Sequence, residues 1–289
     1  MNTNDLKIFE AVATQGNFTK AAESMFTVQS NVTARIKSLE EEFGVELFTR
    51  TSRKVILTAA GDTLMRYSRQ ISHLLEEAKN DISSTDSLKG VVRVGCIETT
   101  MALKVPEIIS QFGDLYPRVE LEFKSAVLPV LINDVLNYRL DAAFVAAPIN
   151  IPSLEQIVIR EERLVVLVPS RIRKLTDVQA EGPLKIVVFE QGCFFRVKLE
   201  SWLSSKGIIQ YKTMVLNSIE GIVNFVEAGL GISLLPEEVI NKYYSNRNIN
   251  SFPVSKELGT MVTLLIYRND LAPSRALRAF IDQYRNAVP

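Results

Sequence analysis

The sequence has almost no cysteine or histidine, the residues that most often bind transition metals. Cys96, Cys193 and His73 are the whole set in 289 residues, and they are not spaced as ligands of one ion. Two cysteines so far apart do not make the disulfide framework of a small secreted domain. We therefore expect neither a metal site nor such a framework, and we interpret His73 as a solvated or interface residue.

The sequence also lacks a net charge and long hydrophobic runs. The 33 basic residues equal the 33 acidic ones, so any surface that attracts nucleic acid has to be local. No apolar run approaches the roughly 18–20 residues that span a bilayer. The start, MNTNDLKIFEAVATQG, has neither the basic region nor the apolar region of a signal peptide. We expect a cytoplasmic protein with no membrane partner.

Motifs of catalysis are missing as well. The chain contains no G-x-S-x-G, no P-loop, no G-x-G-x-x-G between a strand and a helix, and no metal-spaced His, Cys or Asp group. An α/β enzyme would need a nucleophile, a base or a cofactor loop from this set. We therefore expect no catalytic residues and no enzyme.

Residues 1–58 have the periodicity of three short helices followed by a hairpin. Leu6, Phe9 and Val12 share one helical face, and Gly16 is placed to end that helix. Thr19 is expected to cap a second helix, and Thr27, or the backbone beside it, to cap a third.

On the third helix, side chains can be placed by angle, at about 100° per residue. One direction collects the apolar residues Val28, Val32, Ile36, Leu39 and Phe43, which predicts the core face. The opposite direction collects small or polar residues, with two amides on its flanks: Ser30, Thr33, Ala34, Lys37, Gln29 and Asn31. Such a face fits either a solvated helix or a helix that approaches the edges of DNA bases.

A small hairpin with a basic tip is expected next. Two extended runs, 46–49 and 54–57, flank Arg50 and Arg53. A hairpin of this kind can contact phosphates or the minor groove. Taken alone, these first residues leave DNA binding and a plain three-helix unit equally open.

The segment FEAVATQGNFTKAAESMFTVQSNVTARIKSLEEEFGVELFTRTSRKVILTAAG resembles the N-terminal winged helix-turn-helix of the LysR-type transcriptional regulators. The resemblance implies a DNA-binding domain in residues 1–58, with base contacts from the first turns of the third helix and backbone contacts from the wing. On matching positions these residues are Gln29, Ser30, Asn31, Thr33, Arg50 and Arg53. We add Lys37, and we expect Arg35, which lies near the core flank, to contact phosphate.

Residues 59–88 are expected to form a linker helix and a hinge. A heptad pattern runs through Leu64, Tyr67, Ile71, Leu74 and Ala78. It fits a dimerising coiled coil or a helix packed on its own domain, and the resemblance favours the dimer. What it implies is a homo-oligomer, dimer or tetramer, on double-stranded promoter or operator DNA, with RNA polymerase as a further partner.

Residues 89–289 alternate short strands with helices, which predicts a parallel α/β sheet with crossover helices. We expect two lobes, the first about 89–163 with 268–289 and the second about 164–267. This part resembles the family's effector-binding domain, which has the type II fold of periplasmic binding proteins. The resemblance implies a small-molecule effector in the inter-lobe cleft and no cofactor.

Loops that follow strands supply the candidate effector-binding residues, because ligands of open α/β sheets bind at the carboxyl ends of strands. These residues are Thr99, Thr100, Met101, Ser125, Cys193, Phe195, Arg196 and Ser218. The hydroxyls and Arg196 favour a small polar or anionic ligand.

The pattern as a whole favours a LysR-type regulator whose activation or repression of transcription depends on an effector. A solute-binding component of a transport system would explain the second part, but it would need a signal peptide and would leave residues 1–58 without a role. A redox-sensing regulator that uses Cys193 is the other alternative, and it would need an accessible thiol of low pKa.

Overall fold

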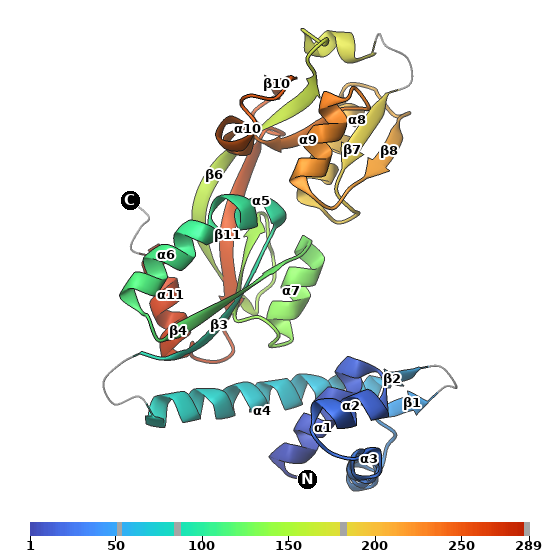
Figure 1. Cartoon of the computed structure of the whole chain (residues 1–289), viewed down its shortest axis with the longest axis vertical. Helices are drawn as coiled ribbons and strands as arrows, with labels where there is room; N and C mark the ends of the chain where they lie inside the picture. Colours follow the sequence, from blue (N-terminus) through green and yellow to red (C-terminus); the bar gives the residue numbers. More distant parts are fainter. Residues whose placement is uncertain (51–53, 84–87, 180–183, 286–289) are drawn as a thin grey trace. The chain divides into compact units, whose positions relative to one another are not determined.

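The computed structural model describes residues 1–50, 54–83, 88–179 and 184–285 (Figure 1). Its chain forms two compact units, Met1–Ser87 with Asn137–Arg139, and Leu88–Leu136 with Leu140–Pro289. We call them the N-terminal and the C-terminal unit and describe each by itself. The domain and lobe boundaries expected from the sequence stay predictions.

The N-terminal unit consists of helices around one small apolar core and a two-stranded hairpin. Its elements are α1 (Thr3–Gln15), α2 (Phe18–Ser24), α3 (Gln29–Phe43), β1 (Phe48–Arg50), β2 (Val55–Leu57) and α4 (Ala59–Ser83). Phe9, Val12 and Ile36 are fully buried in this core. Gly16 ends α1 with a left-handed φ of 61°, as predicted.

One of the two predicted helix caps is wrong. Asn17, not Thr19, caps α2, since its side chain accepts hydrogen bonds from the backbone N–H groups of Thr19 and Lys20. Val28 is the N-cap of α3, and no side chain there bonds the helix end, so the cap is the backbone beside Thr27, which was the second predicted option. The N–H of Asn31 in the first turn donates to the carbonyl of Val28 (3.0 Å).

The core face of α3 is confirmed in its middle and wrong at its ends. Val32, Ile36 and Leu39 are buried, with at most 1% exposed. Val28 and Phe43 are 64% and 44% exposed, because they stand at the first and last positions, beyond the helices that cover the middle.

The hairpin packs closely on the start of α4. In it, Phe48 pairs with Leu57 and Arg50 with Val55. The hydroxyl of Thr58 donates to the carbonyl of Glu46 (2.7 Å) and accepts from the N–H of Gly61 (3.0 Å). A Cβ at Gly61 would come within 2.1 Å of the Leu47 carbonyl oxygen, so only glycine fits there.

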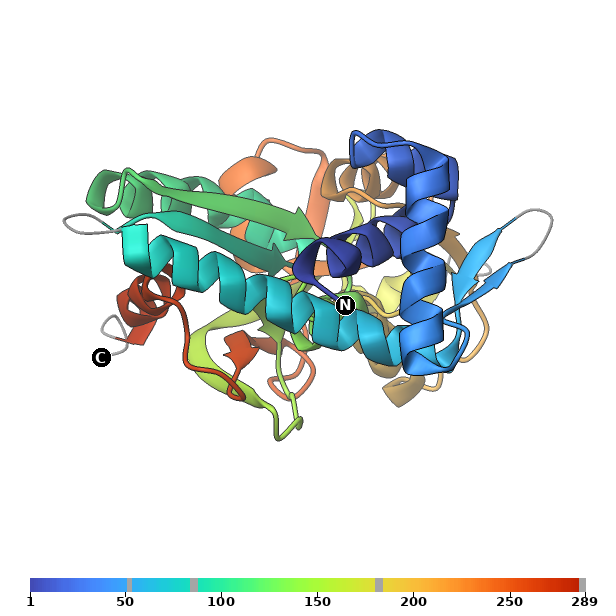
Figure 2. The same ribbon diagram turned by 90° about the horizontal axis from the view of Figure 1, so that it is seen from below.

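Helix α4 is long and continuous over Ala59–Ser83 (Figure 2), and the hinge predicted after it lies outside the described residues. Met65 and Ser68 are buried against the core, and Leu64 is half-buried there. Of the other heptad residues, Tyr67, Leu74 and Ala78 are exposed and Ile71 is half-buried. Most of the predicted seam is therefore free of this chain's own core.

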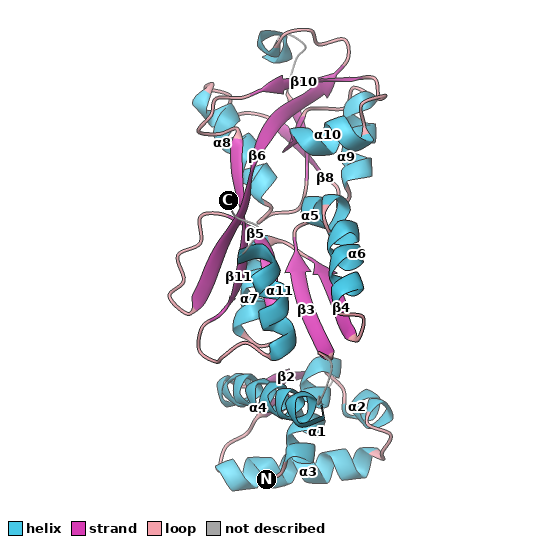
Figure 3. Cartoon of the chain, turned by 90° about the vertical axis from the view of Figure 1, so that its left-hand side faces the viewer, coloured by secondary structure: helices cyan, strands magenta, loops and turns pink. Residues whose placement is uncertain are grey.

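The C-terminal unit contains one mixed seven-stranded sheet, with β10-β6-β11-β5-β3-β4 in order and β9 paired to β6 (Figure 3). The strands are β3 (Gly90–Cys96), β4 (Val119–Ser125), β5 (Ala142–Ala146), β6 (Leu154–Pro169), β9 (Ser233–Pro236), β10 (Ile249–Pro253) and β11 (Thr260–Arg268). Only β4-β3-β5 is parallel, and the pairs of β6 and β11 are antiparallel. The predicted parallel sheet is therefore wrong for most of its strands. Strands β6 and β11 run antiparallel to each of the strands that they pair with.

Strand β6 is one continuous 16-residue strand. Its first part pairs with β11 and its last part with β9 and β10. Strand β11 also pairs with β5 from Thr263 to Tyr267. The chain therefore returns at β11 to the part of the sheet that contains β3, β4 and β5.

A second, parallel pair of strands and several helices complete this unit. They are β7 (Lys185–Val188), β8 (Lys212–Val215), α5 (Glu98–Leu103), α6 (Val105–Leu115), α7 (Leu128–Leu136), the 3-10 turn η1 (Leu175–Gln179), α8 (Phe194–Ser205), α9 (Ile219–Glu227), α10 (Glu237–Tyr243) and α11 (Arg275–Arg285). The alternation of strands and helices predicted for residues 89–289 is confirmed.

Candidate functional site

The first turns of α3 present polar side chains to the outside. Gln29 and Ser30 are exposed, and Asn31 and Thr33 are half-buried. The Thr19 hydroxyl donates to Oε1 of Gln29 (3.2 Å), and Nδ2 of Asn31 donates to the hydroxyl of Thr27 (3.0 Å). These bonds hold both amides at the end of α3 that follows α2.

The two basic residues of α3 have different surroundings. Arg35 forms an ion pair with Asp5 of α1, with 3.1 Å between its guanidinium and the carboxylate. Asp5 is only 7% exposed and also accepts the N–H of Asn2, so Arg35 braces α1 against α3. Lys37 lies in the open and pairs loosely with Glu41 at 3.5 Å. A phosphate contact by Arg35 stays a prediction, and the brace competes with it.

The predicted wing is only partly described. Backbone pairing of β1 with β2 places Arg50 at the outer end of the hairpin. Arg53 lies outside the described residues, and of Arg50 the backbone alone is described. Their contacts with DNA stay predictions.

A pocket of about 260 Å³ lies in the C-terminal unit, where four strands end. Residues that follow β3, β4, β7 and β8 surround it, as expected for a ligand site at carboxyl ends. Its lining consists of Ile97, Glu98, Ser125, Ala126, Val127, Leu128, Phe189, Glu190, Cys193, Phe194, Phe195 and Asn217.

Of the predicted effector-binding residues, Ser125, Cys193 and Phe195 line this pocket. Thr99 and Thr100 are buried within α5, and Met101 packs on the core beside them. The predicted loops border this pocket, but the hydroxyls of Thr99 and Thr100 are buried because helix α5 starts at Glu98, so effector binding by these residues stays a prediction.

Two further predicted residues are used within the unit. Arg196 donates to Glu200 one helical turn further on (3.0 Å), and the Ser218 hydroxyl caps α9 by accepting the N–H of Gly221 (3.1 Å). Neither lines the pocket. Sequence reasoning overlooked Glu190, whose position directly after a buried strand was the available signal.

Both cysteines are unfavourably placed for thiolate chemistry. Burial raises the pKa of the Cys96 thiol to about 12, with a smaller contribution from the charge of Glu98. Burial also raises the pKa of Cys193, although the backbone N–H groups of Arg196 and Phe195 point at its sulfur and partly offset the shift. This environment argues against the redox alternative, which needs a low pKa.

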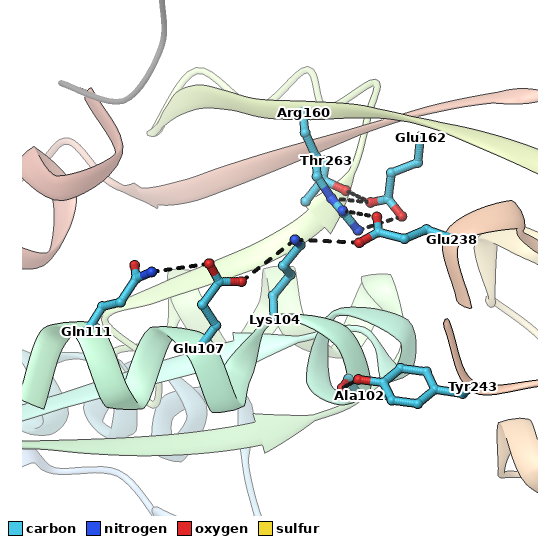
Figure 4. Close-up of polar contacts among 9 residues, drawn as sticks. All are labelled: Ala102, Lys104, Glu107, Gln111, Arg160, Glu162, Glu238, Tyr243 and Thr263. Carbon is cyan, nitrogen blue, oxygen red and sulfur yellow. Dashed lines mark hydrogen bonds and ion pairs between the residues drawn. The ribbon is translucent and has the colours of Figure 1, made fainter. Parts of the chain in front are cut away.

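A cluster of charged side chains joins β6 to α10 and to the start of α6 (Figure 4). The guanidinium of Arg160 pairs with Glu162 (2.8 Å) and with Glu238, and Nζ of Lys104 lies 3.6 Å from Glu238. The Thr263 hydroxyl of β11 donates to Glu162 (2.7 Å). Burial would raise the pKa of Glu238, but the hydrogen bond and charge of Arg160 and the charge of Lys104 outweigh it and lower that pKa.

Metal-binding clusters and membrane-spanning helices are both absent from the described residues. These residues contain no group of three or more His, Cys, Asp and Glu side chains arranged to hold a metal ion. None of the helices in the same described ranges has both the length and the hydropathy to cross a bilayer.

The N-terminal unit presents polar side chains on α3, which is followed by a hairpin, and the C-terminal unit has a pocket. This combination is typical of a ligand-responsive DNA-binding protein. Residues 3–62 match the model of the bacterial regulatory helix-turn-helix protein, lysR family, and residues 85–289 match the LysR substrate binding domain. The chain belongs to the LysR family of transcriptional regulators. It is a LysR-type regulator along its whole length, and effector binding is inherent to that family.

Curated relatives and solved structures agree with this assignment. The uncharacterized HTH-type transcriptional regulator YusT of Bacillus subtilis (strain 168) is 38% identical, over 98% of this chain and 95% of its own. The HTH-type transcriptional regulator SoxR of Arthrobacter sp. (strain TE1826) is 36% identical, over 99% and 98%. Full-length CbnR in complex with its target DNA is similar in fold, with a TM-score of 0.70 and 21% identity over 99% of each chain.

Proposed function

We propose that this regulator binds operator DNA with the first turns of α3 in the major groove and changes its DNA-bound state when a small molecule enters the pocket of the C-terminal unit. The observation that carries the first half is the exposed polar start of α3, at Gln29 and Ser30. Acidic residues appear only at the far end of this helix, from Glu40 onward. Phosphates therefore meet no carboxylate if the helix enters N-terminus first.

The wing and the linker helix have supporting roles in the proposal. Arg50 and Arg53 contact the DNA backbone, which raises affinity without specifying sequence. The exposed seam residues of α4, Tyr67 and Leu74, pack against a second copy, so that two α3 helices meet two half-sites. The protein works as a homo-oligomer in the cytoplasm, meets RNA polymerase at the promoter and catalyses no reaction.

Effector control needs a ligand that binds two arrangements of the protein with different affinity. The pocket at the carboxyl ends of β3, β4, β7 and β8 is built from segments that are far apart in the chain. A ligand held by all of them would change how these segments are arranged. The ion pairs of Arg160, Glu162, Glu238 and Lys104 join β6 to α10 and to the start of α6 in the same unit.

The test is selection of bound sequences from random double-stranded DNA, which finds the operator sequence directly. The native chain should enrich a related pair of half-sites, and Gln29→Ala should lose preference at one position of each half-site. Ser38→Ala, a matched change on the exposed side of α3 further from its N-terminus, should keep the native preference. Enrichment that is unchanged in Gln29→Ala would contradict the proposed groove contact, and no enrichment by the native chain would refute the function.

A further inference from the structure

The pocket of the C-terminal unit has a one-sided charge. Two of its lining residues, Glu98 and Glu190, are acidic, and no Lys, Arg or His is among them. The basic residues nearby in the sequence are used elsewhere. Arg196 is paired with Glu200, and Nζ of Lys198 lies 3.3 Å from the carbonyl of Glu257 and 5.5 Å from the centre of the Phe194 ring.

Backbone donors at the starts of α8 and α9 are occupied. The N–H groups of Phe195 and Arg196, at the start of α8, point at the Cys193 sulfur. The N–H of Gly221 in α9 is taken by the Ser218 hydroxyl. Glu98 itself occupies the first turn of α5, so its carboxylate meets any ligand there. An anionic effector would therefore face two carboxylates and no basic side chain among the lining residues.

The rest of the lining is mainly apolar. Aromatic rings come from Phe189, Phe194 and Phe195, and aliphatic side chains from Ile97, Val127 and Leu128. A metal ion would need more oxygen ligands than this lining offers. An organic cation fits better, because its apolar body packs on the rings and its charge is stabilised by carboxylates and ring faces.

We propose that the effector is a small molecule with a protonated amino group on an apolar or aromatic body. The ammonium group lies between Glu98 and Glu190, and the body lies against the phenylalanines. Ser125 holds the Glu98 carboxylate in place by donating its hydroxyl hydrogen bond to Oε2 (3.1 Å). This inference rests on the proposed function, since it assumes that the pocket is the effector site.

The test uses matched trios that share a body and differ in the head group. One trio is phenethylamine, 2-phenylethanol and 3-phenylpropionate, and an aliphatic trio is 3-methylbutylamine, 3-methylbutanol and 4-methylpentanoate. Each compound is titrated against the full chain, with the melting temperature and the heat of binding as readouts. The amine of at least one trio should bind, and the alcohol and carboxylate of that trio should bind at least about tenfold more weakly.

Charge-removing variants locate the binding. Glu98→Gln and Glu190→Gln should each weaken amine binding by roughly tenfold, since each removes one charged partner of the ammonium group. Glu120→Gln, an exposed residue on β4 outside the pocket lining, is the matched control and should bind amines like the native chain. Equal or tighter binding of carboxylates, no binding by any amine, or native amine affinity in both pocket variants would each overturn the inference.

A DNA-binding assay of the same preparations separates this inference from the proposed function. If the native chain selects an operator but prefers carboxylates in the pocket, the amine inference alone fails. If amines bind through Glu98 and Glu190 but the chain selects no DNA, the regulatory function alone fails. An amine that binds the pocket should also change the affinity for the selected operator by a few-fold or more, as coupled sites do.

Discussion

The outward face of α3 and the pocket of the C-terminal unit are two exposed surfaces of one electrically neutral chain, and they differ in local charge. The first turns of α3 carry amides and hydroxyls, with Lys37 next and carboxylates only from Glu40. The pocket carries Glu98 and Glu190 and no basic residue in its lining. A formal net charge of zero can therefore hide one surface suited to a polyanion and another suited to a cation.

The largest effect on DNA affinity is expected when α3 receives a carboxylate like those that line the pocket. Ser30→Glu places a carboxylate on the exposed first turn, where it would be repelled by phosphates and would lose contact with base edges. We expect DNA affinity to fall by about 100-fold or more, measured by gel shift on the selected operator. Ser204→Glu, on the exposed side of α8, is the control for added charge and should bind DNA like the native chain.

A second change asks whether Arg35 belongs to the DNA-facing surface or to the unit's own scaffold. Asp5→Ala removes the partner of Arg35 and the acceptor of the Asn2 N–H together. We expect a loss of about 1–2 kcal/mol in the free energy of unfolding, measured with urea. Arg35→Ala should cost less, below about 1 kcal/mol, because its side chain is 45% exposed.

The DNA affinities of the same two variants decide the role of Arg35. If it serves only as a brace, Arg35→Ala should lose no more affinity than Asp5→Ala. A much larger loss in Arg35→Ala would show that it contacts phosphate in addition. Lys7→Ala, an exposed basic residue of α1 without this pairing, serves as the control for lost positive charge.

The charged cluster of the C-terminal unit gives a pH-dependent effect. The folded pKa of Glu238 is below its ordinary value of 4.5. Its contribution to stability is therefore complete above about pH 4.5 and is lost as the pH falls through the lower folded pKa. Because the side chain is 44% exposed, Glu238→Gln should cost only about 0.5 kcal/mol at pH 7. The difference between variant and native chain should disappear in acid, as measured by urea unfolding at several pH values.

The smallest effect is expected at Cys193, which lines the acidic pocket. Its raised pKa should make alkylation slow at pH 7 and faster above pH 9, as followed by mass spectrometry. Cys193→Ser should bind the operator like the native chain, before and after mild peroxide. Rapid oxidation of Cys193 at pH 7 that releases DNA would restore the redox-sensing alternative.

Local periodicity was enough to predict the helices and strands that bury a regular face. The angles of α3 located Val32, Ile36 and Leu39 correctly, because each lies a full turn inside the helix. They misplaced Val28 and Phe43, since burial at a helix end depends on neighbours that the local sequence does not reveal. The family resemblance, carried by the first sixty residues, predicted the two-part organisation that the family models confirm.

Long-range partners explain what the sequence could not reveal. The stretch REER at 160–163 looks like a break between strands, yet β6 passes straight through it. Glu238 pairs with Arg160 of this stretch, and the Thr263 hydroxyl donates to Glu162; both partners are far along the chain. Part of the pocket lining, Glu190 among it, was missed for a similar reason. Hydroxyls in the right loops were preferred, whereas the direction of each side chain depends on α5 and on packing between distant segments.

The glycine at position 61 has a mechanical consequence. Because the backbone of α4 lies directly on the Leu47 carbonyl at Gly61, and Thr58 bonds both the hairpin and the helix, the two elements have little freedom to slide. A rotation of α4 about its axis is therefore passed to the wing and its attached helices at the same angle. A change of a few degrees at the far end of this helix would re-aim α3 without bending any hinge inside the N-terminal unit.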